Sequence, residues 1–205
     1  MGTDSHRLGA KRVFDLVLTL VTAPVWGTAL GVIAVVVRLL EGSPIFFRQV
    51  RPGFQGQPFE LLKFRSMSNH RDQTGRLVPD HDRITSVGAF LRKSSLDELP
   101  ELINVLRGDM SLVGPRPLLM EYLDRYSTEQ WRRHEVLPGL TGWAQVNGRN
   151  DQTWEDRLNM DVWYVDHQSL WLDLRILART IGAVLTRRGI SAEGHATMPK
   201  FGEEG

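Results

Sequence analysis

Two adjacent carboxylates, Asp97 and Glu98, and an arginine that follows later in the chain, Arg116, are residue types that suit the transfer of a phosphoryl group. An ionised carboxylate can attack phosphorus as a nucleophile, and the planar fork of an arginine binds phosphate oxygens. Arg116 stands between Pro115 and Pro117, whose fixed φ angles stiffen the backbone around it. Because an anion that attacks a phosphate needs its charge neutralised, this chemistry also calls for a cation such as Mg²⁺.

The same two acids are also ordinary at the start of a helix. The first N–H groups of a helix lack partners and carry partial positive charge, so Ser, Asp and Glu stabilise it there. Ser95 and Glu98 have the spacing of a capping box, whereas Pro100 suits the first turn if Asp97 is the cap. These residues alone favour the structural cap, and a non-catalytic membrane adaptor remains an alternative. Because a helix start also attracts phosphate, the catalytic interpretation stays open beside it.

Composition excludes several other kinds of site. The chain has no cysteine, which removes disulfides, thiol nucleophiles and cysteine-bound zinc. Its 6 histidines occur singly, without the spacing of a metal site. Lys and Arg number 25 against 24 Asp and Glu, so the charge balance predicts no nucleic-acid partner. Asp80, His81 and Asp82 form a D-x-D triplet that holds a metal in some glycosyltransferases, but charged loops contain such triplets by chance.

A long apolar segment precedes these residues. Residues 16–37 carry no charge, and a straight helix of this length is long enough to cross the hydrocarbon core of a bilayer. Pro24, which follows Ala23, lies inside the segment and predicts a kink or a break. We expect small residues beside the proline to satisfy the carbonyl groups that it frees: Thr22, Ala23, Gly27 and Thr28.

The charges around this segment bear on its topology. Positive residues prefer the cytoplasmic side of a membrane. They flank both ends of the segment: Arg7, Lys11, Arg12, Arg38, Arg48 and Arg51. This pattern favours a re-entrant hairpin of two half-helices broken at Pro24, while the length of the segment equally permits a single crossing.

The rest of the chain predicts a small hairpin and several helices. Apolar residues alternate over 59–67 after an extended run near residue 45, with turn residues between them, which predicts a β-hairpin. Helical spacing predicts three helical segments. The first ends at Gly108, the second spans residues 118–135, and the third spans residues 169–189. The last of these is basic, and Trp171 lies near its apolar stripe, which fits the bilayer interface or the domain core. The stripe consists of Leu170, Leu174, Leu177, Ile181 and Val184.

These elements define an expected architecture. We expect an α+β fold, mostly helical, with an N-terminal re-entrant membrane helix, interfacial amphipathic helices and a small β-hairpin around one catalytic core. Residues 1–12 form a cytosolic tail, residues 13–40 the membrane hairpin, and residues 41–205 a membrane-associated catalytic domain in the cytosol.

An ordered series of motifs carries a family resemblance over nearly all of residues 10–200. The motifs are KRVFDLVL, RPG, LLKFRSM, SSLDELPELINVLRGDMSLVGPRPL, LPGLTGWAQVNGRN and DVWYVDHQSLWLDLRIL. In this order the chain resembles the bacterial sugar transferases, which are monotopic polyprenyl-phosphate phosphoglycosyl transferases. The closing SAEGHATMPKF resembles the short members that transfer an N,N'-diacetylbacillosamine phosphate or a related acetamido sugar.

The resemblance implies that a UDP-sugar and undecaprenyl phosphate give undecaprenyl diphosphate sugar and UMP. It makes Asp97 the nucleophile that forms a covalent phosphosugar intermediate, and Glu98 its partner in proton handling or metal organisation. The family depends on Mg²⁺, which implies Asp97 as a metal ligand. The other implied site residues are Arg116 and Arg92 for phosphate, and Lys63, Gln145 and Arg149 for the nucleotide.

The resemblance also implies partners and a location. The substrates are a UDP-sugar, expected to carry N-acetylated amino groups, and undecaprenyl phosphate among membrane lipids, in the first membrane step of glycoconjugate assembly. A homodimer or a contact with downstream glycosyltransferases is compatible with it. The location is the bacterial inner membrane, with the catalytic domain on the cytoplasmic face. The family breaks its membrane helix at a Ser-Pro, whereas this chain has Ala23-Pro24, so the backbone at the break must be satisfied differently.

Overall fold

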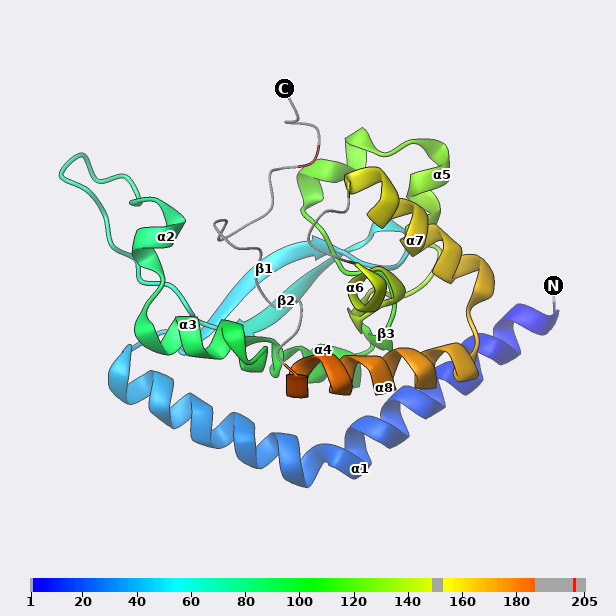
Figure 1. The fold of residues 1–205 in the computed structure, drawn as a ribbon, viewed down its shortest axis with the longest axis horizontal. Coiled ribbons are helices and arrows are strands. Elements are labelled where there is room, and N and C mark those ends of the chain that lie inside the picture. Colours follow the sequence, from blue (N-terminus) through cyan, green and yellow to red (C-terminus); the bar gives the residue numbers. More distant parts are fainter. Residues whose placement is uncertain (1, 149–152, 187–200, 202–205) are drawn as a thin grey trace.

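The computed structural model describes residues 2–148, 153–186 and 201, which form a mostly helical α+β fold, as the sequence predicts. Figure 1 shows the longest helix beneath the remaining elements. In chain order the elements are α1 (Gly2–Leu40), β1 (Phe46–Pro52), η1 (Phe54–Gly56), β2 (Pro58–Phe64), α2 (Asp80–Arg83), α3 (Ser86–Lys93), η2 (Leu96–Glu98), α4 (Glu101–Arg107), β3 (Ser111–Val113), η3 (Met120–Arg125), α5 (Thr128–Trp131), η4 (Arg132–His134), β4 (Gly139–Thr141), α6 (Trp143–Asn147), α7 (Trp154–His167) and α8 (Leu170–Thr186).

Helix α1 is continuous over 39 residues and contains Pro24. Figure 1 shows it bent midway, so that both of its arms rise toward the rest of the molecule. The predicted kink is therefore present, because proline removes a helical N–H and crowds the preceding turn. The hydroxyl groups of Thr22 and Thr28 donate to the carbonyls of Leu18 (2.7 Å) and Pro24 (2.7 Å).

One contact at this bend was not predicted. The indole Nε1 of Trp26 donates to the carbonyl of Thr19 (2.9 Å), and the hydroxyl of Thr22 also lies 3.3 Å from this oxygen. Side chains of α1 itself therefore supply donors near the proline, where the family's serine hydroxyl is missing.

The N-terminal arm of α1 is held by polar contacts. Lys11 Nζ donates to Asp173 Oδ2 of α8 (2.6 Å), and both side chains are buried. Arg12 donates to the carbonyls of Val105 (2.5 Å) and Leu106 (3.0 Å), which lie in the last turn of α4. An arginine there satisfies carbonyl groups that have no helical partner. This arm of α1 is thus fixed to α4 and α8.

The C-terminal arm is held by apolar packing. Val37 is fully buried and lies in one cluster with Phe64 of β2 and Leu91 of α3. Just beyond the helix, Arg65 donates to the carbonyls of Glu41 and Ser43. Both arms of α1 therefore contact the same domain.

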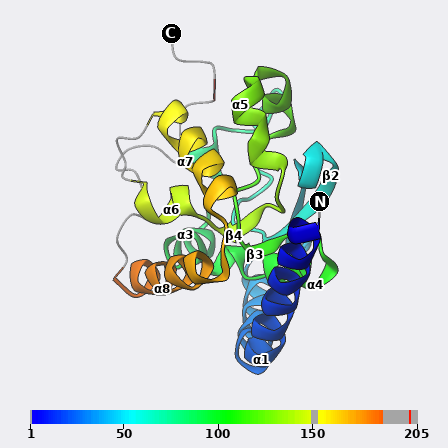
Figure 2. The ribbon, with the colours of Figure 1, turned by 90° about the vertical axis from the view of Figure 1, so that its right-hand side faces the viewer.

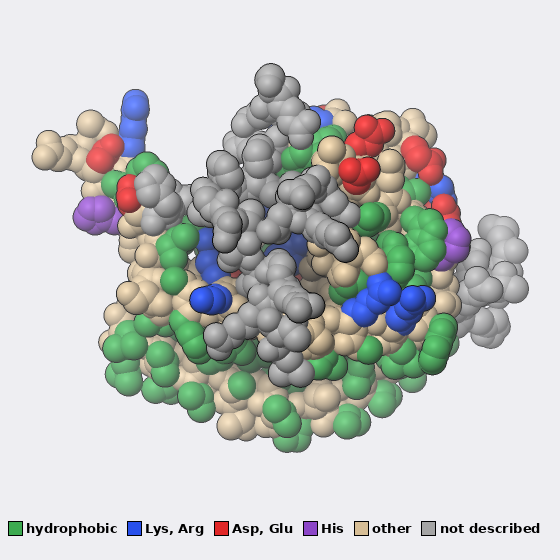
Figure 3. Space-filling view, in the orientation of Figure 1, with side chains coloured by type: hydrophobic (Ala, Val, Ile, Leu, Met, Phe, Trp, Pro, Cys, Tyr) green, Lys and Arg blue, Asp and Glu red, His purple; other side chains and the backbone are tan. Residues whose placement is uncertain are grey.

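The middle of α1 leaves its apolar side chains exposed. The most apolar 18-residue window within residues 9–40 has a mean hydropathy of 2.1, and only 6% of it is buried, so this helix has the length and composition to enter a membrane. Figure 3 shows hydrophobic side chains along the lower edge of the molecule. The exposed residues include Val17, Leu20, Val21, Val25, Val32 and Val35.

Helix α8 lies in the lower part of the molecule, near α1 (Figures 1 and 2), and it also exposes apolar residues. Its buried face carries Leu172, Asp173 and Ile176, which pack toward α1 and the core. Trp171 is 77% exposed, and most of the predicted stripe is exposed as well: Leu170, Leu174, Ile181 and Val184. The stripe is thus the outward face of α8, which favours the bilayer interface over the domain core.

Strands β1 and β2 form the predicted antiparallel hairpin, with Phe46 opposite Phe64. Asn104 of α4 braces it, because its side chain accepts from the N–H of Leu62 (3.1 Å) and donates to the carbonyl of Glu60 (2.7 Å). This contact fixes α4, and the acids before it, against the edge of β2.

A second pair of strands was not predicted. Strands β3 and β4 are parallel and three residues long each, too short to produce a sequence period. Their loops approach so closely that a Cβ atom on Gly139 would lie 2.0 Å from the nitrogen of Gly114, and one on Gly142 would lie 2.2 Å from its oxygen. Glycines therefore allow the loops after β3 and around β4 to meet.

The single helix predicted over 118–135 is wrong. This region consists of η3, α5 and η4, with extended backbone at Tyr126. Ser127 begins a new helix there, because its hydroxyl accepts from the N–H of Gln130 (3.2 Å) and the Gln130 side chain accepts from its own N–H (3.0 Å). This capping box interrupts an otherwise amphipathic pattern.

Candidate active site

The paired acids lie on η2, a short turn between α3 and α4. Ser95 precedes it in the left-handed region (φ 56°), and its side chain makes no capping hydrogen bond. The capping box expected between Ser95 and Glu98 is therefore wrong. Pro100 occupies the N-cap position of α4. Asp97 and Glu98 thus do not cap this helix, and their side chains serve other contacts.

Glu98 accepts from two cations. Lys63 Nζ of β2 lies 2.7 Å from its Oε1, and Arg116 Nη2 of the loop after β3 donates to the same atom. Burial raises the pKa of Glu98, but the charges of Arg116 and Lys63 outweigh burial and lower the pKa to about 2. Glu98 is thus an ionised group that fixes the positions of both cations, and it raises the pKa of Arg116 in turn.

Asp97 has a different environment. Its carboxylate is 9% exposed and has no hydrogen bond or ion pair within the part of the chain that the structure describes. Burial and then the charge of Glu98 raise its pKa, while Lys63, Arg116 and Arg92 oppose this rise. A carboxylate that is near cations but not paired with them is available to a substrate. The two acids are therefore unequal: Glu98 is engaged and Asp97 is not.

Glu101 is a third acid at the site, which the sequence reasoning missed. It is 2% exposed, and its Oε1 lies 3.2 Å from Lys63 Nζ. Burial and then the charge of Glu98 raise its pKa to about 7, although Lys63 opposes this rise. The sequence signal that could have identified Glu101 is its position in the same DELPE motif as Asp97 and Glu98. Lys63 therefore bridges two acids that differ in protonation near neutral pH.

The loop that carries Arg116 is fixed to β4. The N–H of Gly114 donates to the carbonyl of Thr141 (2.9 Å), and the N–H of Gly139 donates to the carbonyl of Pro115 (3.0 Å). The chain thereby brings Arg116 to an acid that precedes it by 18 positions. The fold thus brings Arg116 into contact with Glu98, whereas its role as a phosphate clamp stays a prediction.

The other predicted residues are less closely connected. Arg92 on α3 is near enough for its charge to lower the pKa of Asp97. Gln145 on α6 is exposed and donates to the carbonyl of Leu140 (3.2 Å), with no contact to the acids among the described residues. Arg149 lies outside the described residues. Arg51, which we did not predict as a site residue, is the penultimate residue of β1, and burial and the charge of Arg116 lower its pKa.

The donors fit a loosely held Mg²⁺ rather than a metal cage. Among the described residues, no group of three or more His, Cys, Asp or Glu side chains is arranged to hold a metal. Mg²⁺ commonly binds one or two carboxylates and completes its shell with water and substrate phosphates. The free carboxylate of Asp97 fits this role, since Glu98 is already paired. The side chains of Asp80 and His81 lie outside the described part of the chain, so the D-x-D alternative stays untested.

Comparison with known proteins identifies the family. The sequence matches the bacterial sugar transferase family over residues 6–187. It is 53% identical over 191 residues to the Uncharacterized sugar transferase EpsL of Bacillus subtilis (strain 168), covering 93% of this chain and 95% of that protein. It is 41% identical over 186 residues to a UDP-glucose:undecaprenyl-phosphate glucose-1-phosphate transferase of Caulobacter vibrioides, covering 86% and 70%.

Another relative is considerably longer. A UDP-galactose-lipid carrier transferase of Erwinia amylovora is 43% identical over 196 residues, which are 87% of this chain but 41% of that protein. By the extent of these matches, the chain belongs to the bacterial sugar transferase family.

Proposed function

We propose that this chain transfers a sugar 1-phosphate from a UDP-sugar to undecaprenyl phosphate, giving undecaprenyl diphosphate sugar and UMP. The observation that carries this proposal is the inequality of the two acids, since Asp97 is unpaired beside Glu98, which two cations hold. The relatives in Caulobacter and Erwinia are named for transfer from UDP-sugars, to undecaprenyl phosphate and to a lipid carrier.

In the first step, a carboxylate oxygen of Asp97 attacks the sugar-proximal phosphorus of the UDP-sugar. The bond from that phosphorus to the bridging oxygen breaks, and UMP leaves with the electron pair. The product is a covalent phosphosugar on Asp97. Arg116, Lys63 and Arg92 supply positive charge around the phosphates, which lets one anion approach another. Asp97 is also the residue that would hold Mg²⁺, which supplies further charge neutralisation when bound.

In the second step, an oxygen of undecaprenyl phosphate attacks the same phosphorus. The bond to Asp97 breaks, the carboxylate is restored and the lipid diphosphate sugar leaves. Glu98 stays ionised throughout because its low pKa is set by Arg116 and Lys63. Its role is to hold these cations in place, while Glu101 is the buried acid with a pKa suited to accepting a proton near pH 7.

We further propose that α1 is a re-entrant hairpin on the cytoplasmic face of the inner membrane. The support is that both arms of α1 contact one domain, through Lys11 and Asp173 at one end and Val37 at the other. A helix that crossed the membrane would carry its ends to opposite sides. The apolar middle of α1 and the exposed stripe of α8 then enter the same lipid layer.

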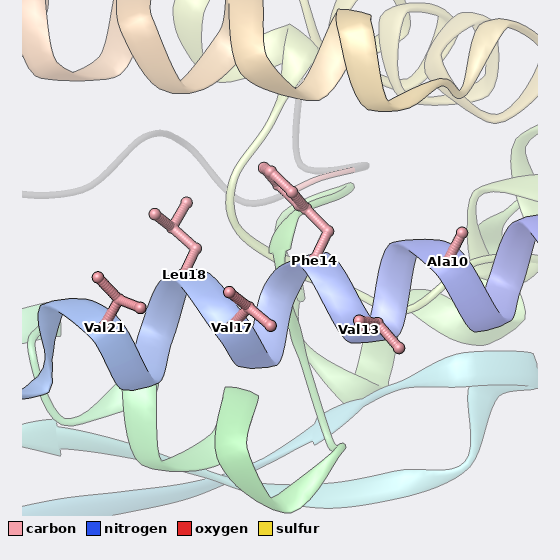
Figure 4. A pocket seen from close by; sticks show the side chains of 6 residues that line it. All are labelled: Ala10, Val13, Phe14, Val17, Leu18 and Val21. Atoms are coloured by element: carbon pink, nitrogen blue, oxygen red, sulfur yellow. The ribbon is translucent and has the colours of Figure 1, made fainter.

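An apolar pocket lined by side chains of the N-terminal arm of α1 supports the same placement. Figure 4 shows Phe14 and Leu18 projecting from α1 toward α8, and the rest of the lining is also apolar: Ala10, Val13, Val17 and Val21. Exposed apolar surface of this kind is typical of a membrane contact. The site would then lie where a lipid phosphate and a soluble nucleotide sugar meet.

The experiment is to measure the nucleotide released from UDP-sugars in the presence of undecaprenyl phosphate. Wild-type protein should release UMP, and UDP as the product would favour a D-x-D glycosyltransferase instead. Asp97→Asn should abolish release and the trapping of labelled sugar phosphate on the protein, whereas Asp166→Asn on the surface of α7 should not. Near wild-type turnover of Asp97→Asn would refute the nucleophile.

The identity of the transferred sugar can be determined with a panel of UDP-sugars. The resemblance of the C-terminal sequence leads us to propose an N-acetylated amino or diamino sugar, while the named relatives use glucose or galactose. Residues 187–200 lie outside the described part. UMP release from UDP-glucose, UDP-galactose, UDP-N-acetylglucosamine and a diacetamido sugar nucleotide should rank the acetamido sugars first, and preference for glucose would overturn this assignment.

A further inference from the structure

The backbone of Arg116 is held by a side chain outside the motif that contains it. The carbonyl of Arg116 accepts a hydrogen bond from Nη2 of Arg133 on η4 (2.7 Å). Pro117, which follows, has no N–H and adds no backbone donor there. Arg133 therefore holds the peptide that follows Arg116, while the N–H of Gly139 holds the carbonyl of the peptide that precedes it.

Arg133 is itself fixed by a buried carboxylate. Its Nε and Nη2 atoms lie 3.1 Å and 2.7 Å from Oδ2 of Asp161 on α7. Arg133 is 2% exposed and Asp161 is 3% exposed. The guanidinium also lies 5.6 Å from the centre of the Tyr126 ring. The pair thus connects the middle of α7 to the loop after β3.

A buried ion pair of this kind is a poor way to gain stability. Removing two charges from water offsets most of their attraction, and apolar replacements are often as stable. The pair instead fixes the orientation of the Arg133 guanidinium, because the two hydrogens of Nη2 serve two acceptors: one on Asp161 and one on the Arg116 carbonyl. A lysine has no such planar fork and cannot reproduce this arrangement.

We propose that Arg133 and Asp161 are positioning residues, which hold the backbone of Arg116 so that its guanidinium meets Glu98 and the substrate phosphate. Among the described residues, neither forms a hydrogen bond or an ion pair with Asp97, Glu98 or Glu101. Their effect passes through Arg116, and this inference rests on the transferase function proposed above.

The chain contains a matched control for this pair. Arg132, the neighbour of Arg133, forms an ion pair with Asp166 on the same helix α7. This second pair connects the same two elements but is exposed and has no contact with Arg116. If activity depends only on the docking of η4 against α7, substitutions in either ion pair should lower it. If activity depends on the position of Arg116, only substitutions in the buried pair should lower it.

The experiment compares Arg133→Lys and Asp161→Asn with Arg132→Lys and Asp166→Asn. Each is assayed for kcat and KM of UMP release and for Tm. We expect Arg133→Lys to lower kcat by about 100-fold, the loss typical of misplacing a catalytic group by about 1 Å. Asp161→Asn should lower kcat less, because the amide oxygen still accepts one bond. Both surface variants should keep wild-type kcat.

A double-mutant cycle separates positioning from a general structural role. In an Arg116→Ala background, Arg133→Lys should cause no further loss of kcat, because the group that it positions is gone. A further loss of the same factor would overturn the proposal, as would a fully active Arg133→Lys. If Arg133→Lys does not fold, the same cycle with Asp161→Asn decides. Absence of UMP release by the wild type would instead refute the transferase function.

Discussion

Lys63 Nζ lies 2.7 Å from Glu98 Oε1, and this ion pair joins the β-hairpin to the turn that carries Asp97 and Glu98. The same Nζ atom lies 3.2 Å from Glu101, so one cation separates two acids. Without it, Glu98 and Glu101 would repel each other across a buried space. The β-hairpin thus contributes the cation that compensates these two acids.

We expect Lys63→Met to lower kcat by at least about tenfold, since a lost charge-assisted contact at a site of this kind is worth roughly 1.4 kcal/mol or more. Glu101 should then become fully protonated at pH 7, because a buried acid beside an ionised one loses its compensating charge. UMP release measures the first effect. The control is Arg48→Met on the same hairpin, whose ion pair with Glu60 is exposed. Equal losses in both variants would contradict a specific role for Lys63.

The raised pKa of Glu101 predicts that the free energy of unfolding depends on pH. Its pKa is raised from an ordinary 4.5 to about 7 in the folded protein, so the folded state binds a proton more tightly than the unfolded state. The stability linked to this proton is complete below pH 4.5 and is lost as pH rises through 7. Over this window it amounts to about 3 kcal/mol at most.

The variant Glu101→Gln isolates this effect, because glutamine keeps the shape and carries no charge. The difference in Tm between Glu101→Gln and wild type should be small near pH 4.5 and should increase in favour of the variant up to pH 8. Other buried acids titrate in both proteins and cancel in the difference. A difference that does not depend on pH would contradict the raised pKa.

Several residues of this candidate site could be predicted from the sequence. The other residues could not, and the reasons are physical. Asp97, Glu98 and Arg116 lie in motifs whose order is specific to the family, so they were identified without the fold. Glu101 and Arg133 were not, because their roles depend on contacts between elements distant in the chain: with Lys63 of β2, and with Asp161 of α7.

Prediction of the fold from the sequence was limited in a similar way, because some elements have no recognisable sequence period. The hairpin and α8 have clear periods and were predicted, and the bend of α1 followed from Pro24. The strands β3 and β4 were missed because three residues carry no period. The helix over 118–135 was misjudged because amphipathic spacing continued across Ser127, where a local capping box starts a new helix.

The contact between α1 and α8 predicts a large stability effect. Asp173 is fully buried and accepts from Lys11 Nζ (2.6 Å) and from the Tyr164 hydroxyl (2.7 Å). Lys11→Met should destabilise the protein by about 3–5 kcal/mol, because it leaves a buried carboxylate without its cation. Thermal unfolding in detergent measures this, with Arg107→Met on the exposed side of α4 as the control. A change of Tm no larger than that of the control would show that Asp173 is satisfied without Lys11.

The proposed hairpin predicts the sidedness of the two ends of α1. Because the natural chain has no cysteine, single cysteines can be introduced at Gly2 and at Gly42 and labelled from either side of the membrane. Both should react only from the cytoplasmic side, since Lys11 and Val37 tie both arms to one domain. A cysteine at Val25, in the exposed middle of α1, should resist water-soluble reagents from both sides. Labelling of Gly2→Cys from the outer side would refute the hairpin, and it would also require the contact between Lys11 and Asp173 to break in the membrane.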